Sequence, residues 1–204
     1  MLFANLIEFA AQSELEPAWQ QISNMVKEGK VRYAGVCNCN IEQLKRIQPI
    51  HSVASLQPPY SMIERDAEES GVLDYCREHN IGVVAYSPMQ KGLLTGKFNK
   101  QRVQRLPIED HRRNDPNFME PRLTANLDLV KKLTILAKKH GKTPAQVAIA
   151  WVLRRPEVTS AIVGARRPSQ VEETVIAGDL VLSSEDIKSI DGLLVKYRKA
   201  LILG

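Results

Sequence analysis

Several common sequence signals are missing from this chain, and each absence weakens the case for a class of protein. No apolar run approaches the about 18 residues that a membrane-spanning helix needs. The apolar start MLFANLIEFAAQ has no basic region before it and is interrupted by Glu8, so it does not match a secretory signal. No GxGxxG motif follows a predicted strand, which leaves a Rossmann-type dinucleotide site without support. We expect no membrane association.

Cysteine and histidine are few and show no metal or disulfide pattern. The three cysteines are an odd number without CxxC spacing, and Cys37 and Cys39 are too close in sequence for an easy disulfide. We therefore expect reduced thiols and a cytoplasmic protein. The four histidines have no HxxxH-type spacing, so no metal site is predicted; they are His51, His79, His111 and His140.

Aromatic residues are also scarce, at 5% of the chain, and this bears on how the basic charge is interpreted. The net charge is +5, but the basic residues are scattered and are not interleaved with aromatic ones. A nucleic-acid role would rest on the net charge alone. We favour a small anionic ligand and expect no nucleic-acid partner.

The residues that are present form an alternation of short apolar strands and amphipathic helices. Helix starts are marked by Asn40, by Thr143 with Gln146 three residues later, and by Ser183 or Ser184. The predicted strands are 31–36, 53–57, 81–86 and 159–165. The predicted helices are 15–29, 41–50, 66–79, 123–140, 143–155, 168–177 and 184–198, and 88–121 is predicted to be irregular. A first helix followed by four strand–helix units indicates an α/β fold with a parallel sheet.

Two architectures fit this alternation. Four such strands could begin a doubly wound sheet, or they could form half of a (β/α)8 barrel. A whole barrel typically needs about 250 residues, and this chain has 204. The residues alone leave both architectures open.

Distinctive side chains follow the predicted strands, where parallel α/β folds bind ligands. Asn38 and Gln57 could pair with a carboxamide, Tyr86 could stack on a flat heterocycle, and Lys and Gly at 91–97 could hold phosphates. Arg166 and Arg167 could bind a further phosphate through bidentate hydrogen bonds. Taken singly, each also suits an ordinary turn, core or solvated position. Together they predict a nicotinamide dinucleotide with a 2′-phosphate.

Five stretches of the sequence resemble the aldo-keto reductase superfamily, in its bacterial or potassium-channel-β-like branch. They are VKEGKVRYAGVCN (26–38), ASLQPPYS (54–61), CREHNIGVVAYSPMQKGLLTGK (76–97), TPAQVAIAWVLRRPEVTSAIVGARRPSQVEET (143–174) and the tail LSSEDIKSID. They run in the family's order and spacing from about residue 18 onward. The resemblance implies the C-terminal half of a TIM-type (β/α)8 barrel that binds NADP(H).

The resemblance also implies roles for particular residues. Asn38 and Gln57 resemble the amides that hold the nicotinamide carboxamide, with Cys37 where the family usually has Ser, and Tyr86 resembles the ring stacked under the nicotinamide. The loop over the pyrophosphate is matched by Ser87, Pro88, Met89, Gly92 and Lys97. The adenosine end is matched by Gly164, Arg166, Gln170 and Glu173, with Arg166 and Arg167 on the 2′-phosphate. Thr174 stands where the family usually has Asn, and Arg112 is a further candidate cofactor contact.

The resemblance does not extend to catalysis. The family's catalytic Asp, Tyr, Lys and His lie in the first half of the barrel, and residues 1–17 match the family poorly. We therefore predict a single, N-terminally truncated domain over 1–204 that has no catalytic residues of its own. It would derive from an NADPH-dependent enzyme that reduces a small-molecule carbonyl to an alcohol, without turnover by this chain alone. The alternative is a non-catalytic NADP(H)-binding or regulatory module. Either a homodimer or pairing with a missing N-terminal half is expected, and the substrate is not predicted.

Overall fold

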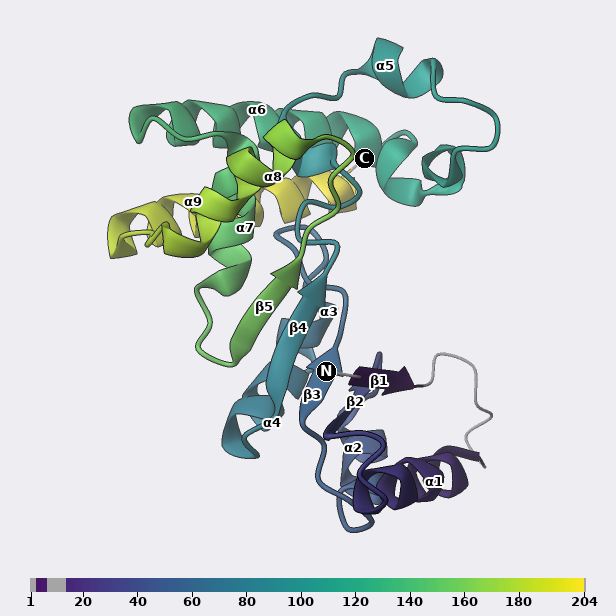
Figure 1. Ribbon diagram of the computed structural model, residues 1–204. Coiled ribbons are helices and arrows are strands. Elements are labelled where there is room, and N and C mark those ends of the chain that lie inside the picture. Colours follow the sequence, from purple (N-terminus) through teal and green to yellow (C-terminus); the bar gives the residue numbers. More distant parts are fainter. Residues whose placement is uncertain (1–2, 7–13, 204) are drawn as a thin grey trace. The chain divides into compact units, whose positions relative to one another are not determined.

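The computed structural model describes residues 3–6 and 14–203, and it divides the chain into two compact units. The first unit comprises the described residues up to Tyr60, together with Glu64–Tyr86 and Arg155–Ile162. The second comprises Ser61–Ile63, Ser87–Arg154 and the described residues from Val163 onward. Each unit has its own secondary structure and its own buried side chains, and each is described below by itself (Figure 1).

A five-stranded parallel sheet organises the first unit, in the order β1-β2-β3-β4-β5 (Figure 1). The strands are β1 (Phe3–Leu6), β2 (Tyr33–Cys37), β3 (Ser55–Gln57), β4 (Gly82–Tyr86) and β5 (Val158–Ile162). The helices of this unit are α1 (Leu15–Lys27), α2 (Ile41–Ile47), α3 (Asp66–Glu69) and α4 (Val72–Glu78). A doubly wound sheet reverses its strand order at a switch point, and this sheet does not. The order therefore decides for the barrel-type arrangement.

The core of the first unit follows the apolar pattern of its strands and helices. Val36, Leu56 and Val83 lie on three adjacent strands and are fully buried. Trp19 on α1 is also fully buried, and its indole Nε1 donates to the carbonyl oxygen of His51 at 3.0 Å. Removing such side chains from water supplies a large part of the stabilisation of this unit.

Helices dominate the second unit. They are α5 (Lys100–Gln104), α6 (Arg122–Lys139), α7 (Pro144–Leu153), α8 (Pro168–Val175) and α9 (Ser184–Leu203), with 3-10 turns η2 (Leu93–Thr95), η3 (His111–Asn114), η4 (Pro116–Phe118) and η5 (Ile176–Asp179). The central helix is α7, in which Ala145 to Val152 are all buried. A helix that is apolar on every side belongs in a core, and α7 contacts α6, α8 and η5.

The predicted caps of three helices are confirmed. Asn40 and Thr143 each form a capping box with the glutamine three residues later. Of the two serines proposed for α9, Ser183 is the cap, because its Oγ accepts from the amide of Asp186 at 3.1 Å. These local hydrogen bonds satisfy amides that the helix itself leaves without partners.

Other predictions of secondary structure need correction. The strand β1 was not predicted, so the chain has a strand before its first helix. The single helix predicted at 66–79 is two helices, separated at Gly71, whose φ of +78° cannot continue a right-handed helix. The segment 88–121 is not wholly irregular, because it contains α5 and three 3-10 turns. The strand predicted at 159–165 ends at Ile162, and α9 extends to Leu203.

Candidate functional site

The predicted nicotinamide-side residues lie at the carboxyl ends of three neighbouring strands of the first unit. Cys37, the last residue of β2, pairs with Gln57, the last residue of β3. Asn38 follows directly, and its backbone N–H donates to the Gln57 carbonyl oxygen at 3.1 Å. Tyr86 ends β4, and its backbone N–H donates to the Pro58 carbonyl oxygen at 3.0 Å. Two amide side chains and one aromatic ring are thus brought to one edge of the sheet.

The backbone adopts an uncommon conformation directly after two of these strands. Asn38 after β2 and Ser87 after β4 both have φ of 56°, in the left-handed region. This region costs non-glycine residues of order 1–3 kcal/mol, and such residues gather at functional sites. The Asn38 side chain is exposed, while Gln57 and Tyr86 are half-buried. An exposed amide on a constrained backbone suits recognition of a ligand better than it suits packing.

Two thiols lie near these amides: Cys37 makes a weak hydrogen bond, and Cys39 is buried. The Cys37 Sγ lies 3.9 Å from the Gln57 Oε1, which is a weak hydrogen bond. Burial, and to a smaller extent the neighbouring Cys37, raise the pKa of the Cys39 thiol to about 11. Since the thiolate is the nucleophile, Cys39 is not suited to covalent chemistry. All three cysteines are free, in agreement with the prediction of reduced thiols.

In the second unit, the chain after β4 forms a tightly wound turn over Ser87–Gly92. Ser87, Gln90, Lys91 and Gly92 all have positive φ, and Gly96 follows with φ of 76°. The Gln90 amide donates to the Ser87 carbonyl oxygen at 2.8 Å, and the Gly92 amide donates to that of Met89 at 3.1 Å. This is the segment that the family resemblance assigns to the pyrophosphate. Successive backbone N–H groups in a turn can form a concave site that favours anions.

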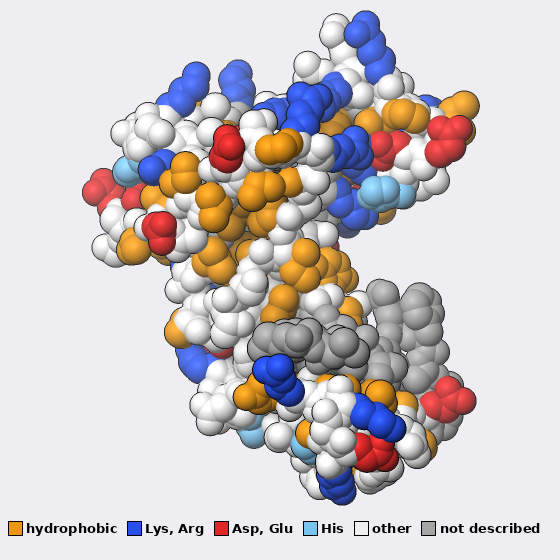
Figure 2. All heavy atoms as spheres, in the orientation of Figure 1, with side chains coloured by type: hydrophobic (Ala, Val, Ile, Leu, Met, Phe, Trp, Pro, Cys, Tyr) orange, Lys and Arg blue, Asp and Glu red, His pale blue; other side chains and the backbone are white. Residues whose placement is uncertain are grey.

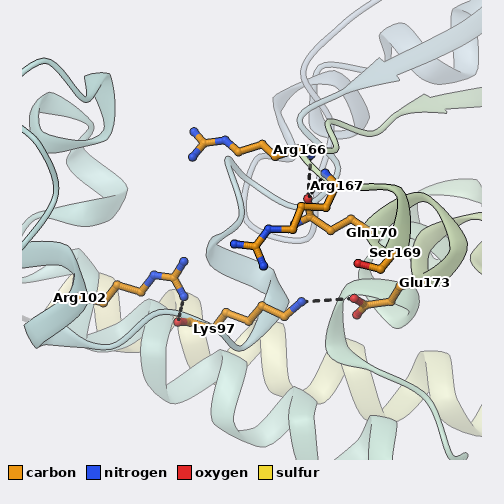
Figure 3. Close-up of a pocket in the computed structure, with 7 residues that line it drawn as sticks. All are labelled: Lys97, Arg102, Arg166, Arg167, Ser169, Gln170 and Glu173. Atoms are coloured by element: carbon orange, nitrogen blue, oxygen red, sulfur yellow. Dashed lines mark hydrogen bonds and ion pairs between the residues drawn. The ribbon is translucent and has the colours of Figure 1, made fainter.

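A cavity of about 410 Å³ lies in the same unit and is strongly basic. Figure 2 shows basic side chains gathered on this part of the second unit, and Figure 3 shows those that line the cavity. The lining residues are Lys97, Arg102, Arg166, Arg167, Ser169, Gln170 and Glu173. Four cationic side chains face one carboxylate, so the cavity has an excess of three positive charges. This donor set fits an anion such as a phosphate group.

Two side chains order the walls of the basic cavity. The Gln170 Oε1 accepts from the backbone amides of Arg166 at 2.7 Å and Arg167 at 3.1 Å, and so fixes the turn that presents both arginines. Glu173 accepts from the Lys97 Nζ at 3.2 Å through its side chain, and its carbonyl oxygen accepts from the Gln146 Nε2 at 2.7 Å. The cavity therefore has a hydrogen-bonded frame on the α8 side (Figure 3).

Five of the predicted cofactor residues line this cavity, and two further lining residues, Arg102 and Ser169, were missed. Arg102 lies on α5, donates to the Lys97 carbonyl oxygen at 2.9 Å, and has its guanidinium 4.9 Å from the centre of the Phe98 ring. No sequence motif marks Arg102, and the available signal was the Asn99 cap that starts α5. Arg112 does not line the cavity. It forms an ion pair with Asp110, whose pKa lies below its ordinary value because of the hydrogen bonds from Arg112.

The remaining predicted residues surround these two sites. Pro88 and Met89 lie within the Ser87–Gly92 turn, and the exposed Gly164 lies between β5 and α8. Thr174 donates its hydroxyl to the Gln170 carbonyl oxygen at 2.7 Å, within its own helix. Its side chain is thus occupied where the family usually has an asparagine.

Two buried tyrosines hold other polar side chains. The Tyr60 hydroxyl donates to the Glu68 carboxylate at 3.0 Å, and the Tyr75 hydroxyl donates to the Gln48 Oε1 at 2.5 Å. Burial raises the pKa of Tyr75, and its ring stacks on His79 with the ring centres 3.9 Å apart. Both hydroxyls serve the packing of the first unit.

Over the part of the chain that the structure describes, no three His, Cys, Asp or Glu side chains gather to hold a metal ion. None of its described helices is both long and apolar enough to cross a membrane.

Comparison with known proteins adds an independent line of evidence. A family model described as the aldo/keto reductase family matches residues 5–195. Aldo-keto reductase YhdN of Bacillus subtilis is 35% identical over 181 residues, which are 88% of this chain and 54% of that protein. The aldo-keto reductase yakc of Schizosaccharomyces pombe, whose name carries NADP(+), is 31% identical over 184 residues, or 89% of this chain and 54% of that protein.

Solved structures show a similar fold. The glycerol dehydrogenase from Gluconobacter oxydans superposes with a TM-score of 0.85 at 32% identity, over 93% of this chain and 57% of that one. The chain spans about half the length of the curated relatives that it matches.

Proposed function

Since this chain belongs to the aldo/keto reductase family, we propose that it is the NADP(H)-binding part of an oxidoreductase that converts a small carbonyl compound to an alcohol. The cofactor would supply the hydride that adds to the carbonyl carbon. Asn38 and Gln57 would bind the carboxamide of the nicotinamide, and Tyr86 would support the ring. The turn at Ser87–Gly92 would hold the pyrophosphate, and the basic cavity would hold the adenosine 2′-phosphate.

The observation that carries this proposal is the excess of positive charge in the cavity. NAD has no 2′-phosphate, and a cavity that presents three arginines and one lysine against one carboxylate would gain little from it. A phosphate dianion, in contrast, accepts charge-assisted hydrogen bonds from arginine in a bidentate manner. The cavity thus favours NADP(H) over NAD(H).

Turnover is a separate question from binding. Reduction of a carbonyl needs a proton at the oxygen as the hydride arrives, and a positioned acid contributes about 10²–10⁴-fold. The family resemblance assigns no residue of this chain to the Asp, Tyr, Lys and His set. We therefore propose that this chain alone binds cofactor without appreciable turnover. The alternative of a non-catalytic or regulatory module predicts the same behaviour. The free thiols support the proposed cytoplasmic location.

We further propose that another strand–helix segment, from a second copy or from a missing N-terminal half, covers the open surfaces. In the first unit, each of β1 and β5 pairs on one side only with the described strands. In the second unit, α8 has no buried residue, and Val171 and Val175 on one of its faces are 54% and 66% exposed. Unpaired strand edges and uncovered apolar faces favour association.

The test is a titration of the purified chain with NADPH and with NADH, followed by Trp19 and Trp151 quenching and by cofactor fluorescence. We expect clear preference for NADPH. Arg166→Ala should weaken NADPH binding by about thirtyfold, since a charged hydrogen bond contributes about 2 kcal/mol, and should leave NADH binding unchanged. Arg105→Ala, at an exposed arginine that does not line the cavity, is the matched control. Equal binding of both cofactors would contradict the proposal, and light scattering on the same samples measures association.

A further inference from the structure

The turn at Ser87–Gly92 holds several non-glycine residues in strained backbone conformations. Three of its residues, Ser87, Gln90 and Lys91, are not glycine and yet have φ of 56°, 45° and 54°. Such conformations persist only where the surroundings over-determine them. Contacts from outside the turn must therefore hold it.

One of these contacts is fully buried. The Ser61 Oγ donates to the Gln90 Oε1 at 3.1 Å, and both residues belong to the second unit. Ser61 is 0% exposed and Gln90 is 5% exposed. The Ser61 Oγ also accepts from the backbone amide of Ile63 at 3.3 Å, which orients the hydroxyl. A buried hydrogen bond of this kind is costly to break, because the acceptor that is left behind finds no water.

A second contact holds the next residue of the turn. The Lys91 Nζ donates to the Asp115 Oδ2 at 2.6 Å, and Asp115 is 7% exposed. Burial raises the pKa of Asp115, but the hydrogen bonds from Lys91 and from the amide of Asn117 outweigh burial, so the pKa lies below its ordinary value. The carboxylate therefore stays charged and paired with Lys91. Two adjacent left-handed residues are thus held through their side chains by separate segments.

We propose that Ser61 is a positioning residue for the phosphate-binding turn, acting through Gln90. Its hydroxyl keeps Gln90 in the left-handed conformation and so presents the backbone of Ser87–Gly92 to the pyrophosphate. This inference rests on the proposed function, which assigns the pyrophosphate to that turn. It is specific to the pyrophosphate, because the arginines of the basic cavity are held separately by Gln170.

The test compares two ligands across matched variants of the full chain. NADPH reaches both the turn and the basic cavity, whereas 2′-AMP carries only the adenosine and the 2′-phosphate. Ser61→Ala should raise the Kd for NADPH about tenfold while changing the Kd for 2′-AMP less than about twofold. Ser61→Cys keeps the volume of the side chain but is a weaker donor, so it should show a smaller loss of NADPH binding. Ser189→Ala, at an exposed serine of α9, is the control.

Each outcome has a distinct meaning. If the unmodified chain fails to bind NADPH, the proposed function fails before Ser61 is tested. If it binds, and Ser61→Ala weakens NADPH and 2′-AMP equally, Ser61 supports the unit as a whole and the positioning role is overturned. Unchanged NADPH binding in Ser61→Ala also overturns it. Thermal melting of each variant identifies any that fail to fold, and in that case Ser61→Cys alone decides between these outcomes.

Discussion

The ion-pair cluster at the start of β5 allows a quantitative prediction for the first unit. Arg155 contacts three carboxylates: Glu157, Asp74 at 2.6 Å and Glu68 at 3.3 Å. The Glu157 side chain is 0% exposed, whereas that of Arg155 is 17% exposed. The Glu157 Oε2 has no hydrogen-bond partner among the described residues, so Arg155 is the main compensation for a buried charge.

Arg155→Met should therefore lower the free energy of unfolding by about 3 kcal/mol. Removing one partner of a buried pair typically costs about 3–5 kcal/mol, and the partial exposure of Arg155 favours the lower end. Urea unfolding followed by circular dichroism and by tryptophan fluorescence measures the loss. Arg77→Met is the matched control. Arg77 pairs with Asp74 at 3.1 Å where both side chains are about half-exposed, and its loss should cost under about 0.5 kcal/mol.

A double variant tests the reason as well as the size. In Arg155→Met with Glu157→Met, no buried charge remains, and replacing both partners with apolar groups is often close to neutral. Most of the lost stability should return. If Arg155→Met costs less than about 1 kcal/mol, or if the double variant is as unstable as two independent losses would make it, the assignment of Glu157 as a buried charge dependent on Arg155 is wrong.

Two further predictions concern the second unit. Thr143→Ala should destabilise by about 1 kcal/mol in thermal melting, because it removes the side-chain cap of α7, while Thr143→Ser should lose much less. Asp186→Asn tests a pH dependence: the Ser183 hydroxyl first, and then His140 at 2.7 Å, hold the pKa of Asp186 below its ordinary value of 3.8. The stabilisation that the Asp186 carboxylate contributes is fully present above that value and is lost as the pH falls through the lowered pKa of the folded state. The difference in Tm between the unmodified chain and Asp186→Asn should therefore be present near neutral pH and disappear in acid. A gap that stayed constant with pH would contradict this.

The parts of the fold that could be predicted are those encoded locally. Asn40 with Gln43, and Thr143 with Gln146, carry their helix starts within four residues, and the structure confirms both. The parts that could not be predicted depend on distant partners. The four residues of β1 carry too little pattern by themselves, and they are a strand because Phe3–Leu6 pair with Tyr33–Val36. The break between α3 and α4 depends on the conformation of Gly71, which a helical pattern tolerates in sequence.

The candidate site divides in the same way. Asn38, Gln57 and Tyr86 could be placed together as candidates because ligands of parallel sheets bind at strand ends, and strand ends can be predicted from the sequence. Arg102 was missed because it comes from α5, far along the chain from Arg166 and Arg167, and reaches the same cavity only in the folded unit. The strain at Gln90 was likewise invisible, since no pattern reveals a positive φ at a glutamine.

The two units contain different parts of the proposed cofactor site. The turn at Ser87–Gly92 and the basic cavity both belong to the second unit, and their supporting contacts, from Ser61 to Gln90 and from Gln170 to the arginines, lie within it as well. The proposed phosphate contacts therefore all lie within the second unit. Asn38, Gln57 and Tyr86, which we propose bind the nicotinamide, belong to the first unit. A change confined to the sheet of the first unit, such as Arg155→Met, should thus weaken NADPH binding while 2′-AMP binding persists.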